Sequence, residues 1–304
     1  MTLNRRTFLQ KSSQAALIAA IGGLPLQSIA ANNEIHLTVL HTNDWHSRIE
    51  PFAMDGGKWQ GQGGAAQRAT LIKQIRKETP NILLLDSGDI FQGTPYFNYY
   101  HGEVEIALMN EMKYDVVTLG NHDFDAGILA LAKAAQNANF TYLCANYEVK
   151  NTELFNHIFN TKVFDFNGLK IGIMGIGIEL QGLVPDALWN GVSVLNPLII
   201  ANQTAFHLKR EQGCHYVICL SHLGLKYDNS SQPSDVLLAK YTQNIDMILG
   251  GHTHTFLDAP IIENNQQNNK VLIHQSGWGG LQLSRIDLIF NHNFHKKSWH
   301  AKKV

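Results

Sequence analysis

Two histidines lie one residue apart at the end of an apolar run, in the sequence LGGHTH of residues 249–254. In an extended segment, side chains two residues apart point to the same face, so His252 and His254 can approach a common point. The glycines in front of them let the backbone pass close to that point. Two converging neutral imidazoles are typical metal ligands, yet a His-x-His pair after glycines is also common in plain surface loops. The motif alone leaves both interpretations open.

Four other apolar runs end in the same kinds of side chain. They are HTNDWH at 41–46, LLLDSGD at 83–89, LGNHDFD at 119–125 and ICLSH at 218–222. The polar ends of all five runs supply Asp44, His46, Asp89, Asn121, His122, Asp123, Asp125, His222, His252 and His254. Taken singly, each residue could cap a helix, close a turn or be a hydrogen-bonded loop histidine. Because five separate runs end alike, we interpret the set as one site.

The side chains of this set suit metal ions. Carboxylate oxygens, an amide oxygen and imidazoles, without any thiolate, are ligands that Mn²⁺, Zn²⁺, Fe²⁺ or Co²⁺ accept. The set holds more ligands than one ion needs, and one carboxylate can bridge two ions. We therefore predict a site for two divalent ions, whose identity the ligand types leave open.

The elements that must position these residues alternate along the chain. Apolar residues at three- and four-residue spacing predict helices within 63–78, 104–112, 128–138 and 234–243. The five apolar runs read as strands, and the alternation of strands with helices predicts a largely parallel sheet of the α/β class. In such sheets the site forms beyond the carboxyl ends of the strands, which is where all five polar clusters fall.

The later part of the chain predicts a second sheet. Residues 164–177 read as a hairpin through Asn167-Gly168, and residues 270–290 read as two more strands joined by a glycine-rich turn. We therefore expect a sandwich of two sheets with helices outside. The glycines of residues 55–64 lack the Lys-Ser/Thr ending of a phosphate-binding P-loop, so we interpret them as a structural turn.

Residues 1–30 have the layout of an export signal, with Arg5-Arg6 in front of an apolar stretch too short to span a membrane. The arginine pair followed by Phe8-Leu9 resembles the twin-arginine signal of bacteria, although an ordinary secretory signal would also fit. We expect cleavage after Ala30 and one domain over residues 31–304. The protein would then be exported, to the periplasm or outside the cell.

The composition and the charge of the chain limit the classes of binding partner that we expect. The formal net charge is −1, and the expected signal holds cations but no acidic residue, so the mature chain is acidic and nucleic acid is not an expected partner. No other segment approaches the length of a membrane span. The three cysteines, Cys144, Cys214 and Cys219, are interpreted as packed thiols. The basic tail at 295–304 is expected to be a solvated end.

The ordered motifs DWH, GD, GNHD, SH and GGHTH resemble those of the calcineurin-like metallophosphoesterases, and HTNDWH, GDIFQGTP and GNHDFD look like the 5'-nucleotidase branch of that family. The resemblance covers nearly the whole mature chain. It implies an αββα sandwich with a dimetal centre that hydrolyses small phosphate esters, nucleotides among them. By motif matching it assigns Asp44, His46 and His254 to one ion, Asn121, His222 and His252 to the other, and Asp89 to both.

The resemblance also implies the chemistry. Two ions about 3.5 to 4 Å apart clamp phosphoryl oxygens and supply a metal-bound hydroxide as the nucleophile. His122 would assist the leaving group, Asp125 would hold its tautomer, and Asn121 with His122 would contact the substrate. Asp125 could also cap the helix that follows it, and Asp123 is interpreted as a supporting or structural residue.

Part of the family pattern has no counterpart in this sequence. Bacterial 5'-nucleotidases continue into a C-terminal domain whose aromatic residues clamp the nucleoside, whereas this sequence ends at Val304. Three alternatives follow: a broad phosphomonoesterase, an enzyme completed by a separate nucleotide-binding subunit, or a specialist that uses its own loops. The loop aromatics are Trp45, Trp59, Phe91 and Tyr96, although such rings are more often core packing.

Two functions of other kinds also stay open at this stage. Thiosulfohydrolases of sulfur oxidation resemble the same family and share the twin-arginine route. A protein that binds metal or a partner without catalysis is the other alternative, but the His122 and Asp125 pair argues against it, because metal storage needs no such pair.

Overall fold

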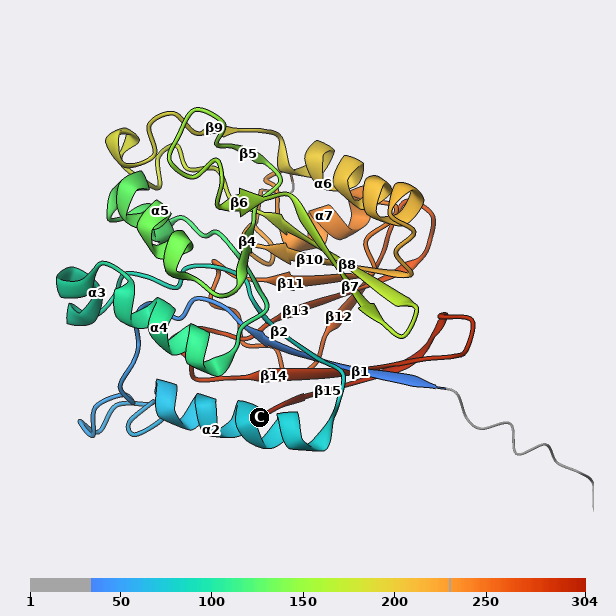
Figure 1. Cartoon of the computed structure of the whole chain (residues 1–304), viewed down its shortest axis with the longest axis horizontal. Helices are drawn as coiled ribbons and strands as arrows, with labels where there is room; N and C mark the ends of the chain where they lie inside the picture. The colour runs from blue at the N-terminus through green and yellow to red at the C-terminus, as the bar shows by residue number, and fades with distance from the viewer. Residues whose placement is uncertain (1–33, 230) are drawn as a thin grey trace, which may run out of the picture. The chain divides into compact units, whose positions relative to one another are not determined.

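Two β-sheets with a shared apolar interior form the centre of the computed structural model, which describes residues 34–229 and 231–304 (Figure 1). The strands of the first sheet, in spatial order, are β15 (Lys296–Lys303), β14 (Ser284–Phe290), β1 (Ile35–Thr42), β2 (Ile82–Asp86), β3 (Val116–Thr118), β4 (Thr141–Leu143) and β6 (Ile158–Phe159). Those of the second are β12 (Ile261–Asn264), β13 (Lys270–Gln275), β11 (Met247–Gly250), β10 (Tyr216–Ser221), β8 (Leu169–Ile176) and β7 (Thr161–Phe166). A small pair, β5 (Tyr147–Glu148) with β9 (Ser193–Val194), lies apart from both.

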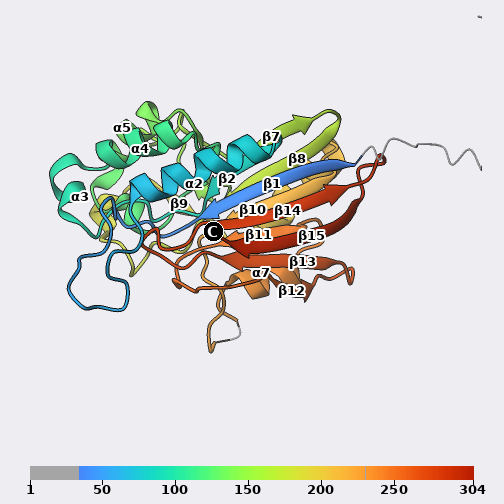
Figure 2. The ribbon, with the colours of Figure 1, turned by 90° about the horizontal axis from the view of Figure 1, so that it is seen from below.

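Helices cover the outer faces of the two sheets, and Figure 2 shows α2, α4 and α5 on one side of the sandwich and α7 on the other. The helices are α2 (Ala65–Glu78), α3 (Pro95–Tyr100), α4 (Glu103–Met112), α5 (Gly127–Asn137), α6 (Pro197–Phe206) and α7 (Asp235–Tyr241). Shorter turns are η1 (His122–Phe124), η2 (Asp186–Leu188) and η3 (His207–Glu211). This arrangement confirms the predicted αββα sandwich and the four predicted helices.

The inner strands of both sheets are parallel and buried on both faces. Strands β1, β2, β3, β4 and β6 run parallel in the first sheet, as do β8, β10, β11 and β13 in the second. Their sequences are nearly continuous apolar runs, as in ILLLD of β2 and YVICLS of β10, because each face packs against either a helix or the other sheet. Their carboxyl ends consequently meet at one edge of the sandwich.

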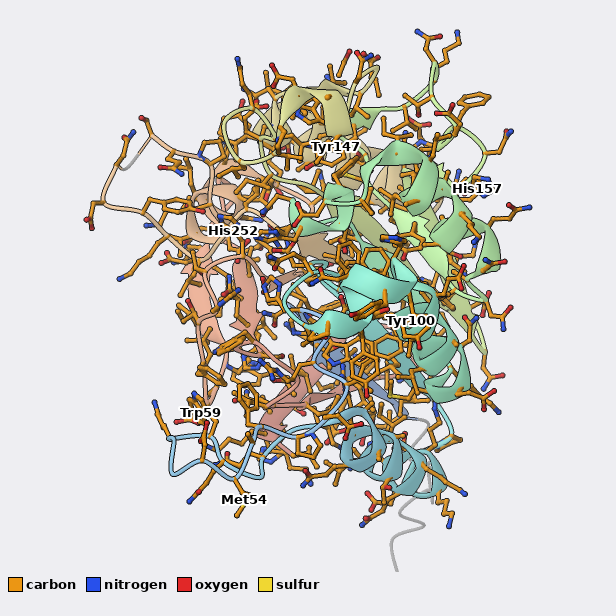
Figure 3. The ribbon with its side chains drawn as sticks, turned by 90° about the vertical axis from the view of Figure 1, so that its left-hand side faces the viewer. Met54, Trp59, Tyr100, Tyr147, His157 and His252 are labelled. Carbon is orange, nitrogen blue, oxygen red and sulfur yellow. The ribbon has the colours of Figure 1, made fainter. Side chains whose placement is uncertain are left out.

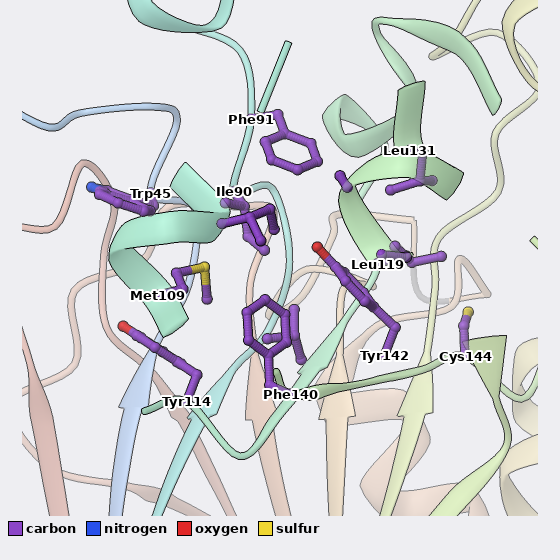
Figure 4. Close-up of a cluster of buried hydrophobic side chains, with 14 of the residues drawn as sticks. Trp45, Ile90, Phe91, Met109, Tyr114, Leu119, Leu131, Phe140, Tyr142 and Cys144 are labelled. Carbon is purple, nitrogen blue, oxygen red and sulfur yellow. The ribbon is translucent and has the colours of Figure 1, made fainter. Parts of the chain in front are cut away.

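The predicted hairpin is present and the predicted thiols are packed. Strands β7 and β8 pair antiparallel through Asn167 and Gly168, which have φ angles of 55° and 94°. Positive φ at both turn positions gives the tight turn that Asn-Gly favours. All three cysteines are free and buried. The interior between the first sheet and its helices holds Trp45, Phe91 and Cys144, together with Met109 and the two tyrosines labelled in Figure 4.

Two expectations about the last strands were wrong. Strands β13 and β14 do not share a sheet, because the glycine-rich turn between them carries the chain from the second sheet to the first. The basic tail is not a solvated end: Lys296–Lys303 forms β15, which pairs antiparallel with β14 at the edge of the first sheet. Trp299 and Ala301 of β15 pack on the interior between the sheets, while Lys297 and Lys302 are exposed on this edge strand and discourage pairing with another chain.

The export signal predicted for residues 1–30 lies outside the described residues. Residues Ile35–Val304 form one compact unit. Within the part of the chain that the structure describes, no helix combines the length and hydropathy needed to cross a bilayer.

Candidate metal centre

The polar residues predicted as one site come together at the edge where the parallel strands end. The segments that follow β1, β2, β3, β10 and β11 meet there, which is the side of the molecule that faces the viewer in Figure 3 around His252. Asp44, Asp89 and His222 are at most 1 % exposed, whereas His252 and His254 are half-buried. Asp44, Asp89 and His222 therefore form the floor of the site, and His252 and His254 lie nearer to solvent.

The first cluster joins Asp44 and His46 from the end of β1 to His254 from the loop after β11. His254 Nε2 lies 3.3 Å from Asp44 Oδ1 and 3.0 Å from His46 Nε2. The His46 Nε2 atom lies 3.8 Å from Asp44 Oδ1. Three potential ligand atoms thus face one another at distances that a single ion could bridge.

The second cluster joins Asp89, after β2, to His222 and His252, after β10 and β11. His222 Nε2 lies 3.0 Å from Asp89 Oδ2, and the side chain of Asn121 lies in the same group, with its Oδ1 at 3.0 Å from His252 Nδ1. The two clusters contain six of the seven residues that the family resemblance assigns to two ions, and the seventh, Asn121, lies beside the second cluster.

Asp89 lies between the two clusters. Its Oδ2 atom is 3.0 Å from His222 Nε2 in the second cluster and 4.0 Å from His46 Nε2 in the first. Its Oδ1 atom accepts a 2.8 Å hydrogen bond from the backbone N–H of His122. A carboxylate in this position is placed to bridge two ions.

The backbone conformation of the site is unusual. Asp44, His46, Asp89, His252 and His254 have φ angles of 50°, 51°, 54°, 73° and 51°. Non-glycine residues rarely adopt positive φ, and such conformations gather at functional sites where the surrounding fold enforces them. The histidine pair of the GGHTH motif is therefore not extended, and this is why His252 and His254 turn to different clusters.

Residue 251 must be a glycine because two candidate ligands lie close to its Cα atom and leave no room for a side chain. A Cβ atom there would lie 2.9 Å from Asp44 Oδ2 and 3.0 Å from His222 Nδ1. The φ angle of Gly251 is not positive. Gly251 thus lets the backbone pass between two of the candidate ligands, which is the close approach expected from the glycines in front of the histidine pair.

The burial and charge of the site fit cations. Among the described ion pairs, only histidines face the carboxylates of Asp44 and Asp89, with no lysine or arginine. Burial lowers the pKa of His222, but Asp89 and Asp44 outweigh it and raise that pKa to about 10. Burial, reinforced by His222, lowers the pKa of His252 to about 4. His252 is therefore neutral, whereas His222 carries the positive charge beside Asp89 until a cation replaces its proton, because an imidazole must be neutral to bind a metal ion.

The orientation of His222 supports the same conclusion. Its Nδ1 atom lies 2.6 Å from the Ser87 carbonyl oxygen, to which it donates, so that Nε2 faces the carboxylates. Nε2 is buried and has no hydrogen-bond partner with acceptable geometry. A backbone carbonyl that fixes the ring while the other nitrogen is left for the metal is the usual arrangement around metal-binding histidines.

His122 and Asp125 lie beside the second cluster and pair with each other. His122 Nδ1 is 2.8 Å from Asp125 Oδ2, and the side chain of His122 is 36 % exposed at the mouth of the site. The hydrogen bond that His122 donates to Asp125 is the main cause that raises the pKa of His122. Asp125 does not cap α5, whose N-cap residue is Ala126 without any side-chain cap.

Sequence reasoning missed several contacts that hold the site. Asn43 donates to Asp44 Oδ2 at 2.5 Å and to the Gly277 carbonyl at 2.6 Å. The carboxylate of Asp123, interpreted as supporting, accepts backbone N–H groups of Asp89, at 3.1 Å, and Gly120, at 2.8 Å. The position of Asn43 between two polar residues in HTND was a usable signal, but a backbone carbonyl such as that of Ser87 leaves no trace in a sequence.

The loop aromatics have different surroundings. Trp45 and Phe91 are at most 2 % exposed and are core packing. Tyr96 donates from its hydroxyl to Glu50 at 3.1 Å, and Trp59 stacks on Phe256. One aromatic residue at the site was not predicted: Trp278 stacks on the His254 imidazole.

Comparisons with known proteins agree with this geometry. The family model described as Calcineurin-like phosphoesterase matches residues 37–256. The snake venom 5'-nucleotidase of Crotalus adamanteus is 31 % identical over 301 residues, which is 90 % of this chain and 48 % of the venom protein. The 5'-nucleotidase of Vibrio vulnificus is 31 % identical over 307 residues, with 91 % and 54 % covered.

Among solved structures, the 5'-nucleotidase precursor of Thermus thermophilus superposes with a TM-score of 0.78 at 29 % identity, covering 89 % of this chain and 54 % of that one. The chain thus spans about half the length of the curated relatives that it matches.

Proposed function

Because the chain belongs to the calcineurin-like phosphoesterase family, we propose that it is a phosphohydrolase that uses two divalent ions to cleave small phosphate esters, nucleotides in particular. The observation that carries the proposal is the pair of clusters with Asp89 between them. Asp44, His46 and His254 would hold one ion, and Asn121, His222 and His252 the other. Mn²⁺, Zn²⁺, Fe²⁺ and Co²⁺ all suit these ligands.

When bound, two such ions supply Lewis-acid stabilisation of the phosphoryl group and activate water for attack on phosphorus. The residues of the chain would position the ions and the substrate and would exclude bulk water from the site. The buried carboxylates of Asp44 and Asp89 form the floor of the site, and their negative charge would hold the two cations beneath the reacting group. No side chain of the protein is needed as a nucleophile.

His122 is proposed as the residue that serves the leaving group, and His122 and Asn121 as substrate contacts. Its imidazole lies at the mouth of the site, 5.3 Å from the His46 ring between centroids. Asp125 accepts the hydrogen of Nδ1, which leaves Nε2 to donate to an ester oxygen or to a phosphoryl oxygen. This is the arrangement of a general acid whose tautomer is fixed by a carboxylate.

The compartment is a further proposal that rests on the sequence. Arg5-Arg6 and the apolar stretch behind them support export by a twin-arginine route, with the periplasm or the exterior as destination. Because folded proteins use that route, the metal centre could be loaded before export.

A substrate panel on the mature protein tests the function. The protein is stripped of metal, reloaded with Mn²⁺, Zn²⁺ or Co²⁺, and given nucleoside monophosphates, nucleotide sugars, cyclic nucleotides, an aryl phosphate and cysteine S-sulfonate. We expect metal-dependent release of phosphate, with nucleoside monophosphates preferred. The Asp44→Asn variant is the matched inactive control.

Each other outcome identifies one of the alternatives. Weak activity on all phosphate esters would indicate that a separate nucleotide-binding polypeptide completes the enzyme. Hydrolysis of cysteine S-sulfonate alone would show a thiosulfohydrolase. A fully metal-loaded protein that cleaves none of these compounds would contradict the proposal and favour a metal-binding or partner-binding role.

A further inference from the structure

Beside the first metal cluster, two aromatic ring pairs pack against the turn that carries Trp278, and together we call them the aromatic wall: Phe52 with Trp278, and Trp59 with Phe256. We propose that this aromatic wall is a stacking subsite for the base of a nucleotide whose phosphate lies at the metal centre. The inference rests on the proposed function and extends it, because it gives this chain a base-binding surface of its own.

The wall begins at the metal centre itself. The Trp278 ring stacks on the imidazole of His254, with the centroids 5.5 Å apart and an interplanar angle of 11°. His254 Nε2 in turn lies 3.3 Å from Asp44 Oδ1. Only the imidazole of His254 therefore separates a ligand at the first cluster from Trp278, the first residue of the wall.

The wall continues away from the cluster through two ring pairs. Phe52 meets Trp278 edge to face at 5.5 Å, and Trp59 stacks on Phe256 at 5.4 Å with an angle of 24°. Figure 3 shows Trp59 on the same side of the molecule as His252, the side that carries the site.

Glycines make the wall a fixed surface. A Cβ atom on Gly277 would lie 2.2 Å from the Phe256 ring, and one on Gly279 would lie 3.0 Å from the Phe52 ring. The turn that carries Trp278 is therefore packed between the two phenylalanines. The Gly279 N–H donates to the Asp44 carbonyl oxygen at 2.7 Å, which ties the wall to the first cluster.

The exposure and charge of the wall distinguish it from core packing. Phe256 is 39 % exposed and the other three rings are half-buried, unlike the fully buried Trp45. The guanidinium of Arg48 lies 4.4 Å from the Phe52 ring centroid, and the ammonium of Lys58 lies 4.3 Å from that of Trp59. Solvent-accessible rings flanked by cations suit a ligand that is both aromatic and anionic, as a nucleotide is.

The first test compares kcat/KM for a nucleoside monophosphate with kcat/KM for ribose 5-phosphate, which lacks the base. In Phe52→Leu and Trp59→Leu, neither of which contacts His254, we expect the ratio of the two values to fall about tenfold. Trp59→Phe should restore most of it. The matched control is Phe155→Leu, an exposed aromatic outside the wall, in which the ratio should stay at the wild-type value.

The second test measures adenosine binding by calorimetry, because adenosine has no phosphate and needs no hydrolysis. We expect adenosine to bind and ribose not to, with about tenfold weaker binding in Trp59→Leu. Adenosine binding without any phosphate release would support the wall and contradict the proposed function. Hydrolysis with an unchanged ratio and no adenosine binding would overturn the base-binding role of the wall and leave the proposed function standing.

Discussion

Side chains with different tasks lie next to each other in the GNHD motif. Asn121 contacts His252 of the second cluster, His122 faces the mouth of the site, and Asp123 points inwards to backbone N–H groups. The η1 turn places them so, because consecutive residues of a tight helical turn point in different directions. A change at one position should therefore affect one property of the enzyme and spare the others.

Replacement of His122 by alanine should lower turnover and spare metal binding. The expected loss in kcat is about 10²- to 10⁴-fold, the usual contribution of a general acid. Metal content by mass spectrometry should stay at the wild-type level. Asp89→Asn is the comparison, because a carboxylate that faces both clusters should be needed for the ions themselves. Unchanged turnover in His122→Ala would remove the role assigned to the His122 and Asp125 pair.

The buried carboxyl of Asp86 should make the free energy of unfolding depend on pH. Burial raises the pKa of this carboxyl from 3.8 to about 7, against the opposing hydrogen bonds of Thr42 and Gly88. The folded state thus keeps a proton that the unfolded state has lost between about pH 4 and pH 7. The free energy of unfolding should fall as the pH rises through this window, by up to about 1.4 kcal/mol per pH unit.

The Asp86→Asn variant isolates this effect. Its amide oxygen can still accept the Gly88 N–H, which lies 2.9 Å from Asp86 Oδ1. Urea unfolding at pH 5 and pH 8 should show that the variant gains stability relative to the wild type as the pH rises. A difference between the two proteins that does not change with pH would contradict the assignment.

At the scale of elements, Asp123 ties two loops together. Its Oδ2 accepts from Gly120, after β3, and its Oδ1 accepts from Ile90, after β2, at 2.8 Å and 3.0 Å. Asp123→Asn would turn an N–H₂ group towards one of these donors. We expect a loss of about 1 to 3 kcal/mol in the free energy of unfolding together with weaker metal binding, measured by titration of the stripped protein.

Asp165→Asn provides the matched control for Asp123. Asp165 accepts the Gly168 N–H at 2.6 Å in the hairpin of β7 and β8, away from the strand ends that form the site. Its replacement should lower stability and leave the metal affinity at the wild-type value. Equal metal affinity in both variants would show that Asp123 acts on stability alone.

Local sequence patterns predicted well which segments form helices and strands, and less well which strands share a sheet. The apolar runs of β2 and β10 and the spacing in α2 follow directly from burial, so they could be read without a structure. The assignment of β13 and β14 to different sheets depends on a turn whose glycines fit either topology. In β15, the two apolar residues that pack on the interior, Trp299 and Ala301, are outnumbered by four lysines and one histidine, which hid the strand.

The candidate site was predictable as a collection of side chains and not as a geometry. Residue types identified a set that the structure brings together. The positive φ angles at Asp44 and Asp89 are tertiary effects, since neither residue type favours them strongly enough to predict. Trp278 was missed because a single tryptophan in a glycine-rich turn has the pattern of an ordinary loop.

At the scale of the whole molecule, bound metal should stabilise the fold. Ions that bind the folded chain and not the unfolded chain add about 4 kcal/mol per site when their concentration is 1,000 times the Kd. Urea unfolding in excess EDTA should therefore occur at a lower urea concentration than in excess Mn²⁺. Asp44→Asn should show a much smaller difference. Equal midpoints with and without metal in the wild type would contradict a metal centre built from these clusters.

Each cluster draws side chains from both sheets. Asp44 and His46 follow a strand of the first sheet and His254 one of the second, while Asp89 of the first sheet meets His222 of the second. An ion in either cluster would therefore link the two sheets. Sliding of one sheet over the other would have to break the coordination of both ions, so the resistance of the sandwich to sliding would depend on the occupancy of the two clusters.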